Sequence, residues 1–488
     1  MKVYLKGHDL EFATQQIYMC MFPGAHAEFV SSEPTEGDYI ISRLETLDNA
    51  FLSETEMHLG GRCVTKSVTE LFPETDDSEE IKRAKRRAVK TSMYLSAVEF
   101  LPRKPAWGAL TGIRPSKVAL KFLEDGKSFD ETVKLMENDY FVSHERAKLA
   151  TTCALRARKL SEKADRRDVS LYVGIPFCAS RCKYCSFVSH SVEKAKHLIA
   201  PYLEMLEREI KLLGNAVREA ELSLKSVYIG GGTPTALSND ELRFVMECIA
   251  RSFDINNVPE YTVEGGRPDT LSLDKIKTIR ELGATRISVN PQTMNDGILK
   301  AMDRRHTADD VVRAIEDVRK VGGLVINTDL IAGLPGDTLK SFESSINRVV
   351  DLVPENITVH TLALKKGSSL KREGAPLPDG DVTAEMVNYA LSRLGEEGYV
   401  PYYLYRQKYM SGNLENVGYS KPGFENLYNN YIMDELHTIL SAGAGGVTKL
   451  IDRQAGRIER IFNPKYPYEY NNAEEKIGET EKRIKEFF

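Results

Sequence analysis

The chain has 488 residues, which is too long for a single ordinary hydrophobic core and indicates roughly two to four domains. Hydrophobic residues make up 42% of it and charged residues 28%, a balance that excludes a disordered or fibrous protein. The formal charge of -5, from 66 basic and 71 acidic side chains, creates no field that would attract a nucleic-acid backbone, so we expect no nucleic-acid partner.

No apolar run approaches the roughly 20 residues that cross a bilayer. The segment from Met1 to Phe12 also lacks the charged and apolar regions of a signal peptide. We therefore expect no membrane span and a cytoplasmic location.

The seven cysteines are an odd number, and four of them are scattered along the chain, so a disulfide framework is not expected. These four are interpreted as ordinary core or surface residues: Cys20, Cys63, Cys153 and Cys248.

Residues 1–165 mix short strand-like pieces, such as residues 38–41, with a helix predicted over residues 78–101, so we expect an α+β amino-terminal domain. Glu79 and Glu80 lie near the start of that helix and a run of basic residues follows them. Such a run is typical of a solvated helix face, with a binding patch as the alternative. Residues 107–115, which hold the single Trp, predict an ordered loop.

Residues 166–370 alternate short runs rich in β-branched and aromatic residues with helical stretches. Strands are predicted over residues 170–175, 225–230, 261–265, 286–290, 324–330 and 357–362, and helices over 194–214, 238–252, 272–282, 307–321 and 338–352. Six strands separated by helices imply a parallel sheet, either doubly wound or curled into part of a barrel. The chemistry of such folds lies where the strands end.

Residues 371–488 predict a third, small domain. Gly374 to Gly380, with two prolines, is typical of a linker, and a helix is predicted over residues 382–397. The remainder is rich in Tyr and Gly.

Three cysteines, Cys178, Cys182 and Cys185, follow the first predicted strand of the barrel with CxxxCxxC spacing. A loop of this kind can wrap three thiolates around one centre. Iron–sulfur clusters are normally held by four cysteines, so three ligands would leave one iron with an open position. Structural zinc sites use CxxC pairs with a second pair downstream, and the sequence has no such pair. Three buried structural cysteines are the remaining alternative.

In the context of six βα units, this motif resembles the radical S-adenosylmethionine (SAM) superfamily. The resemblance implies an α/β fold with a partial (β/α)6 barrel, a 4Fe-4S cluster on the three cysteines, and SAM on the open iron, where one electron cleaves it to a 5'-deoxyadenosyl radical. Gly230 to Pro234 would lie at the SAM amino group and Glu264 would hold its ribose. The SAM-binding residues implied are Tyr172, Tyr184, Gly231, Gly232, Thr233, Glu264, Gln292, Arg304, Asp329 and Ala363.

Each of these residues alone could be a surface or hydrogen-bonding residue, and glycine runs also form tight turns. Their order along the chain is what favours a SAM site. His306 is interpreted as a structural neighbour.

Residues 171–363 resemble the oxygen-independent coproporphyrinogen III dehydrogenases, and residues 402–419 resemble the branch called HemZ. The implied reaction is oxidative decarboxylation of two propionates to vinyl groups, giving protoporphyrinogen IX. The implied partners are coproporphyrinogen III and a one-electron donor such as flavodoxin or ferredoxin.

Two positions depart from that pattern. The dehydrogenases have His where Gly174 stands and Cys where Phe187 stands, and Cys185-Ser186-Phe187 resembles the branch that includes haem chaperones. Three functions stay open: the dehydrogenase, a haem-binding chaperone without decarboxylation, and another radical SAM tetrapyrrole enzyme such as an anaerobic haem-opening methyltransferase.

The segment from Tyr402 to Lys408 combines aromatic and basic side chains that could grip the tetrapyrrole. Aromatic faces such as Tyr402 suit a flat macrocycle, and Arg406 could fork onto a carboxylate. The plain alternative is a buried tyrosine-rich strand with Arg406 and Lys408 in solvent.

Overall fold

The computed structural model describes residues 1–74, 77–376, 378–407 and 410–488, which form two compact units. The first unit comprises Met1–Thr151 and Arg406–Leu414, and the second comprises Thr152–Tyr405 and Glu415–Phe488. This division differs from the expected three parts, with boundaries at 165 and 370. The amino-terminal unit ends earlier, and most of residues 371–488 belong to the same unit as the barrel.

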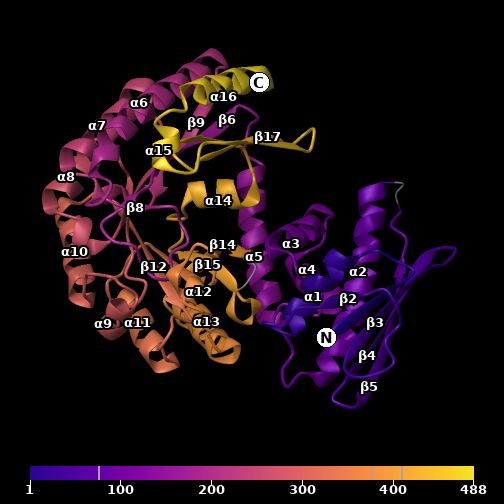
Figure 1. Cartoon of the computed structure of the whole chain (residues 1–488). Coiled ribbons are helices and arrows are strands. Elements are labelled where there is room, and N and C mark those ends of the chain that lie inside the picture. Colours follow the sequence, from indigo (N-terminus) through magenta and orange to yellow (C-terminus); the bar gives the residue numbers. More distant parts are fainter. Residues whose placement is uncertain (75–76, 377, 408–409) are drawn as a thin grey trace. The chain divides into compact units, whose positions relative to one another are not determined.

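The first unit is built on a five-stranded mixed sheet of order β2-β1-β3-β4-β5 (Figure 1). Along β4, Ser53, Thr55 and Met57 are buried, whereas the residues between them are half-buried. This alternation covers one face of the sheet and leaves the other open. The strands are β1 (Lys2–Lys6), β2 (Glu28–Val30), β3 (Tyr39–Thr46), β4 (Ala50–Leu59) and β5 (Arg62–Leu71).

Helix α2 packs on the sheet and occupies most of the range predicted to be helical, ending at Ala97. Its amino end is capped by Asp77, whose side chain accepts from the Glu79 amide. Lys82 pairs with Glu79 at 2.8 Å on its exposed side, as a solvated face would. The helices of this region are α1 (Glu11–Met21), α2 (Ser78–Ala97), η1 (Val98–Phe100), α3 (Pro115–Glu124), α4 (Phe129–Tyr140) and α5 (His144–Ser161).

The second unit contains the predicted six parallel strands, hydrogen-bonded in chain order, with helices between them (Figure 1). The strands are β6 (Asp168–Ile175), β9 (Ser223–Gly231), β10 (Glu260–Gly266), β11 (Arg286–Val289), β12 (Val325–Ala332) and β13 (Asn356–Thr361). The helices are α6 (Lys196–Glu219), α7 (Asn239–Ser252), α8 (Leu273–Glu281), α9 (Asp296–Ala301), α10 (Ala308–Val321) and α11 (Leu339–Asp351). The expectation of a partial (β/α)6 barrel is confirmed.

The carboxy-terminal residues extend this sheet at both ends, which is why they form no separate unit. On one side β16 (Thr438–Ala442) pairs in parallel with β6, followed by β17 (Val447–Asp452) and β18 (Arg457–Phe462). On the other side β15 (Glu415–Ser420) pairs antiparallel with β13, followed by β14 (Val400–Arg406). The outer edges of β6 and β13, which would otherwise expose unpaired N–H and C=O groups, are thereby hydrogen-bonded to β16 and β15.

The remaining elements are short strands, short helices and the helices of the carboxy-terminal part. They are β7 (Phe177–Cys178), β8 (His190–Ser191), η2 (Pro234–Ala236), η3 (Pro268–Thr270), α12 (Ser369–Arg372), α13 (Gly380–Glu396), η4 (Ser411–Asn413), α14 (Leu427–Asp434), α15 (Pro467–Tyr470) and α16 (Glu474–Phe487). No helix within the described ranges is long and apolar enough to cross a bilayer.

Candidate active site

The three cysteines of the motif lie on one loop that begins where β6 ends. β7 within this loop pairs with β8, and the Val192 amide donates to the Cys178 carbonyl at 3.0 Å. Cys178 and Cys182 are buried, whereas Cys185 is half-buried. The loop therefore holds three thiols at the carboxyl end of the first barrel strand, as the motif predicts.

The spacing of the three loop sulfurs restricts the metal centre that they could share. Among the described residues, the one set of three ligand atoms that all lie within 4.8 Å of one another belongs to Glu56, His58 and Cys63, so at least two of the loop sulfurs are farther apart than that. Thiolates on one tetrahedral zinc ion lie only about 3.8 Å apart, given Zn–S bonds of about 2.3 Å. The three loop sulfurs are therefore not drawn together as closely as the ligands of a single zinc ion would be.

Cationic and hydroxyl donors surround these sulfurs. Arg267 and Arg304 each place a guanidinium nitrogen near Cys182 Sγ, at 3.8 and 3.9 Å, and the Thr233 hydroxyl donates to Cys178 Sγ at 3.6 Å. Burial raises the pKa of the Cys178 thiol and raises that of Cys185 to about 11. Metal ligation there must therefore release protons, and the guanidinium groups favour the resulting negative charge.

The glycine turn after β9 lies against the cysteine loop. Gly231 has φ +112°, a conformation that glycine adopts freely, and a Cβ there would lie 2.9 Å from the Ile175 backbone. A Cβ on Gly232 would lie 2.9 Å from Cys178 Sγ and 2.6 Å from the Phe177 carbonyl oxygen. The absence of side chains lets the turn pass directly beside a cysteine of the motif.

A row of polar side chains from neighbouring strands lies at the same end of the barrel. The Tyr228 hydroxyl donates to Glu264 Oε1 at 2.5 Å, and Asp329 lies 3.8 Å from His360. Burial raises the pKa of Glu264 to about 7, and the negative charge of Asp329 adds to the effect. A buried carboxyl of this kind favours a partner that brings hydroxyl donors or positive charge.

Tyrosine rings form one wall of this polar row. Tyr172 of β6 pairs in register with Tyr228 of β9, and both rings stack with Tyr428 of α14. Tyr228 and Tyr428 have centroids 4.5 Å apart. Tyr172 thus lies next to Tyr228, the residue that donates a hydrogen bond to Glu264.

Two further predicted residues carry buried polar atoms without a hydrogen-bond partner among the described residues: Gln292 Oε1 and Arg304 Nε. Gln292 itself has φ +69°, and its backbone joins β12 through the Asp329 carbonyl. Arg304 also donates to the Tyr184 hydroxyl at 2.9 Å and to the Asn290 carbonyl at 2.6 Å. Unpaired buried groups are costly, so these atoms fit a polar ligand in the site.

Ala363 follows β13 and is half-buried. It is the last of the ten predicted SAM residues, nine of which lie on the barrel strands or on the loops that follow them, whereas Arg304 lies between α9 and α10.

Residues 172–349 match the radical SAM superfamily. Over 505 aligned residues the chain is 35% identical to the oxygen-independent coproporphyrinogen-III oxidase-like protein HemZ of Bacillus subtilis (strain 168), covering 99% of this chain and 97% of that protein. The chain belongs to the HemZ-like branch of the radical SAM superfamily. Membership of this superfamily makes a 4Fe-4S cluster and SAM its cofactors.

Other members of the wider HemN, HemW and HemZ family are also similar to this HemZ-like chain. It is 33% identical over 283 residues to the heme chaperone HemW of Bacillus subtilis (strain 168), covering 57% of this chain and 70% of that protein. The coproporphyrinogen III oxidase HemN from Escherichia coli superposes with a TM-score of 0.53 at 23% identity, covering 66% of this chain and 73% of that one. The latter likeness concerns the fold alone.

Sequence reasoning missed Arg267, whose guanidinium lies 3.8 Å from Cys182 Sγ. Arg267 also forms a two-pronged ion pair with Asp269, at 3.0 and 2.8 Å. Although burial opposes it, the neighbouring His306 ring, whose Nδ1 lies 3.6 Å from Asp269, and the hydrogen bonds from Arg267 hold the pKa of Asp269 below its usual value. His306 lies beside this pair, and its interpretation as a structural neighbour stays a prediction. The signal for Arg267 was its place directly after the third strand.

The two residues expected to grip substrate are both buried. Arg406 is 7% exposed, donates to the carbonyls of Leu110 and Asn413, and stacks over the Trp107 ring at 5.5 Å. Tyr402 is fully buried, and its hydroxyl bonds to Asn356 and Asn429 at 3.3 Å.

These contacts correspond to the plain alternative of a buried tyrosine-rich strand. They also correct it, because Arg406 lies in the protein interior and not in solvent. Its guanidinium N–H groups donate to backbone carbonyls, so they do not present a pair of parallel donors to a substrate carboxylate. Lys408, the end of the predicted segment, lies outside the described residues.

Proposed function

We propose that the protein is an oxygen-independent coproporphyrinogen III dehydrogenase, which decarboxylates two propionate side chains to vinyl groups. Two observations together support this proposal. The chain is similar over its full length to a coproporphyrinogen oxidase-like protein, and polar side chains lie at the end of the barrel that carries the three thiols. For each propionate, one hydrogen atom is abstracted from the β-carbon, CO2 leaves, and an acceptor takes the remaining electron.

Cys178, Cys182 and Cys185 are the proposed cluster ligands. The cluster and SAM, when bound, supply the hydrogen-abstracting radical by one-electron cleavage of SAM. Arg267 and Arg304 would offset the negative charge of the ligated sulfurs, since each points at Cys182 Sγ. Buried cations near the cluster would also make its reduction easier.

The proposed SAM site extends from the glycine turn to β12. Gly231 and Gly232 let this turn pack directly against the cysteine loop, so SAM bound at the turn would lie close to the thiols. Glu264 would accept hydrogen bonds from ribose hydroxyls, while Tyr228 holds the carboxyl in position. Gln292 and Arg304 offer one unpaired acceptor and one unpaired donor. These groups can position SAM and limit the entry of water.

An electron donor such as flavodoxin or ferredoxin would approach over Cys185, the least buried thiol of the loop. Phe187 beside it is 66% exposed, and Arg181 is also exposed and donates to the Gly367 carbonyl at 2.7 Å. An exposed apolar ring with a neighbouring cation suits an acidic redox protein.

A heme chaperone is the second candidate function. The observations that favour it are Phe187, which stands where the dehydrogenases have a further Cys, and the 33% identity to HemW over 283 residues. A chaperone with this fold would bind heme and leave coproporphyrinogen unchanged.

A single anaerobic experiment separates the two functions. The chain with reconstituted cluster is supplied with SAM, a one-electron donor, an electron acceptor and coproporphyrinogen III, and the products are analysed by mass. Loss of CO2 and hydrogen from two propionates supports the dehydrogenase. Stoichiometric heme binding with unchanged coproporphyrinogen would reject it in favour of the chaperone.

A further inference from the structure

A second group of metal-ligating side chains lies in the first unit, on the hairpin formed by β4 and β5. The two strands are joined by Gly60 and Gly61, which have φ +58° and +76°, a two-residue turn that glycine permits. The turn brings Leu59 opposite Arg62, so the next pair along the ladder is His58 and Cys63.

The hairpin geometry brings His58 and Cys63 close together. Pairs along an antiparallel ladder alternate between hydrogen-bonded and non-hydrogen-bonded, and a two-residue turn closes on a hydrogen-bonded pair. His58 and Cys63 therefore form a non-hydrogen-bonded pair, in which side chains approach most closely. Glu56 precedes His58 by two residues and so lies on the same face of the sheet.

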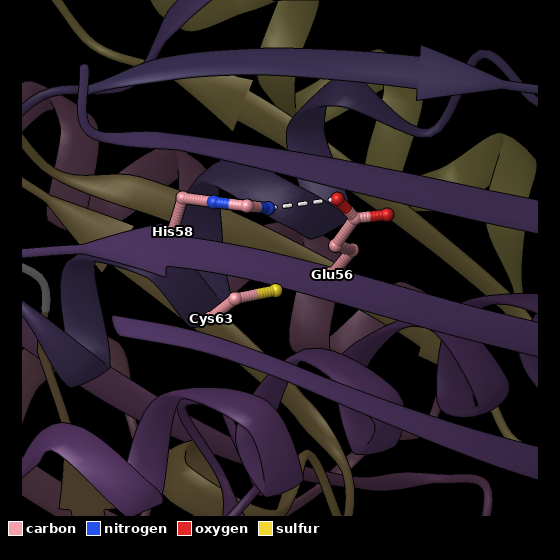
Figure 2. A group of neighbouring side chains, drawn as sticks. All are labelled: Glu56, His58 and Cys63. Carbon is pink, nitrogen blue, oxygen red and sulfur yellow. Dashed lines mark hydrogen bonds and ion pairs between the residues drawn. The ribbon is translucent and has the colours of Figure 1, made fainter. Parts of the chain in front are cut away.

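One ligand atom from each of these three residues, a nitrogen of His58, a carboxylate oxygen of Glu56 and Cys63 Sγ, lies within 4.8 Å of the other two (Figure 2). His58 Nε2 and Glu56 Oε1 are 2.8 Å apart. Ligands on a tetrahedral zinc ion are separated by about 3.3 to 3.8 Å, given bonds of about 2.0 to 2.3 Å. Small side-chain rotations would suffice to close the three atoms around one ion.

The surroundings hold two of these ligands in place. Glu56 Oε2 accepts from Arg43 at 2.9 Å, which leaves Oε1 directed toward His58. The Tyr39 ring stacks on the His58 ring at 4.2 Å. Such outer contacts orient metal ligands in known sites. The charge of Arg43 is balanced by further ion pairs with Glu33 and Glu54, at 3.1 and 2.9 Å.

A plain ion pair between His58 and Glu56 is the simpler interpretation of this group. The chain offers a direct comparison, because His144 and Glu137 form the same kind of pair, also at 2.8 Å. No third ligand atom completes that pair among the described residues. What distinguishes the hairpin is therefore the Cys63 thiol, which is exposed and opens the group to ions from solvent.

We propose that Glu56, His58 and Cys63 form a zinc-binding site. Thiolate and imidazole ligands together favour Zn²⁺ over Mg²⁺ or Ca²⁺, which prefer oxygen ligands alone. Three protein ligands leave the fourth tetrahedral position for water or an external ligand. Binding removes the proton of the Cys63 thiol and requires His58 Nε2 to present its lone pair to the ion.

The test measures Zn²⁺ binding to the full chain with its cluster reconstituted, by equilibrium dialysis and metal analysis. We expect one zinc per chain in addition to the cluster iron. Cys63→Ser should weaken zinc binding by more than about 100-fold, because loss of an outer contact alone costs about 10- to 100-fold and Cys63 is a direct ligand. His58→Gln should do the same.

Two control variants remove a histidine and a cysteine that lie outside the proposed zinc site. His144→Gln disrupts the equivalent His–Glu pair, and Cys248→Ser removes a buried thiol elsewhere, so both should bind zinc like the wild type. With Co²⁺ in place of Zn²⁺, a thiolate-to-cobalt absorption band should appear in the wild type and be missing from Cys63→Ser. Equal zinc affinity in the wild type and Cys63→Ser would overturn the proposal. So would absence of zinc beyond the cluster in the wild type.

Discussion

Tyr228 donates a 2.5 Å hydrogen bond to Glu264 across the neighbouring strands β9 and β10. The other oxygen of Glu264, Oε2, lies beside Gly230. A Cβ added to Gly230 would be only 2.9 Å from this oxygen. One oxygen of the carboxyl is thus held by the protein, and the other lies next to the glycine turn. This arrangement fits a carboxylate whose second oxygen serves a ligand.

Replacing Glu264 by Gln should weaken SAM binding and leave the cluster in place. A hydrogen bond to a charged group contributes roughly 1.5 to 3 kcal/mol, or about 10- to 150-fold in affinity. Asp329→Asn should have a similar effect. Titration of SAM into the two variants, with iron content measured in parallel, checks this. Unchanged affinity in both would show that SAM lies elsewhere.

Loss of any one of Cys178, Cys182 and Cys185 should abolish the cluster, because two thiolates cannot hold it. The measurement is iron per chain after anaerobic reconstitution of each Ala variant. Cys153→Ala and Cys248→Ala are the controls, and their iron should stay near the wild-type value. Full iron in a chain lacking all three motif cysteines would contradict the ligand assignment.

Gly232→Ala should impair cluster assembly although it adds only one methyl group. That group would meet Cys178 Sγ at 2.9 Å and the Phe177 backbone at 2.6 Å, and neither can move without shifting the loop. Iron content should fall well below the wild type. Gly395→Ala is a matched control, because no atom lies within 4 Å of the added carbon. Equal iron in both variants would argue against this close approach.

Arg406→Ala should destabilise the protein, because it leaves buried carbonyls of Leu110 and Asn413 without their donor. Unsatisfied buried groups cost about 1 to 3 kcal/mol each, so the loss of both carbonyls' donor should cost about 2 to 6 kcal/mol in total. Urea unfolding measures the loss. A variant that is as stable as the wild type but binds tetrapyrrole about tenfold more weakly would restore Arg406 as a substrate residue.

The stability of the protein should depend on pH through Glu209. Burial raises the pKa of Glu209 to about 7, although Tyr470, Gly443 and Asn463 all donate to its carboxyl. Because the folded chain holds this proton more tightly than the unfolded chain, the contribution is full below about pH 4.5 and is lost as pH rises to about 7.

Glu209→Gln should remove this part of the pH dependence. Between about pH 4.5 and 7 the wild type should lose up to about 3 kcal/mol of unfolding free energy relative to the variant. Urea unfolding at several pH values provides the measurement, with the exposed Glu475→Gln as control. Parallel pH profiles for the wild type and Glu209→Gln would refute the assignment.

The barrel could be predicted because its strands carry a strong local pattern. In β6, Val169, Leu171 and Val173 are all fully buried, and the apolar residues at these alternate positions mark the strand. The cysteine motif and the glycine turn were found for a similar reason, since each is contiguous in sequence.

Contacts between distant segments could not be predicted. Arg406 follows a run of tyrosines, and nothing near it in sequence indicates that its partner is the carbonyl of Leu110. The carboxy-terminal strands were assigned to a separate domain because no local signal shows that β16 pairs with β6. By contrast, the Gly60–Gly61 turn would have allowed the pairing of His58 with Cys63 to be predicted.

The pairing of β16 with β6 has a consequence for the order of events during synthesis. Val169 lies opposite Thr438, so the first barrel strand stays unpaired on one edge until β16, about 270 residues later, has left the ribosome. The motif cysteines follow that strand directly and emerge long before their surroundings are complete. Stable cluster insertion must therefore follow translation, and a nascent or truncated chain would expose reactive thiols beside an open strand edge, a combination that favours aggregation and oxidation.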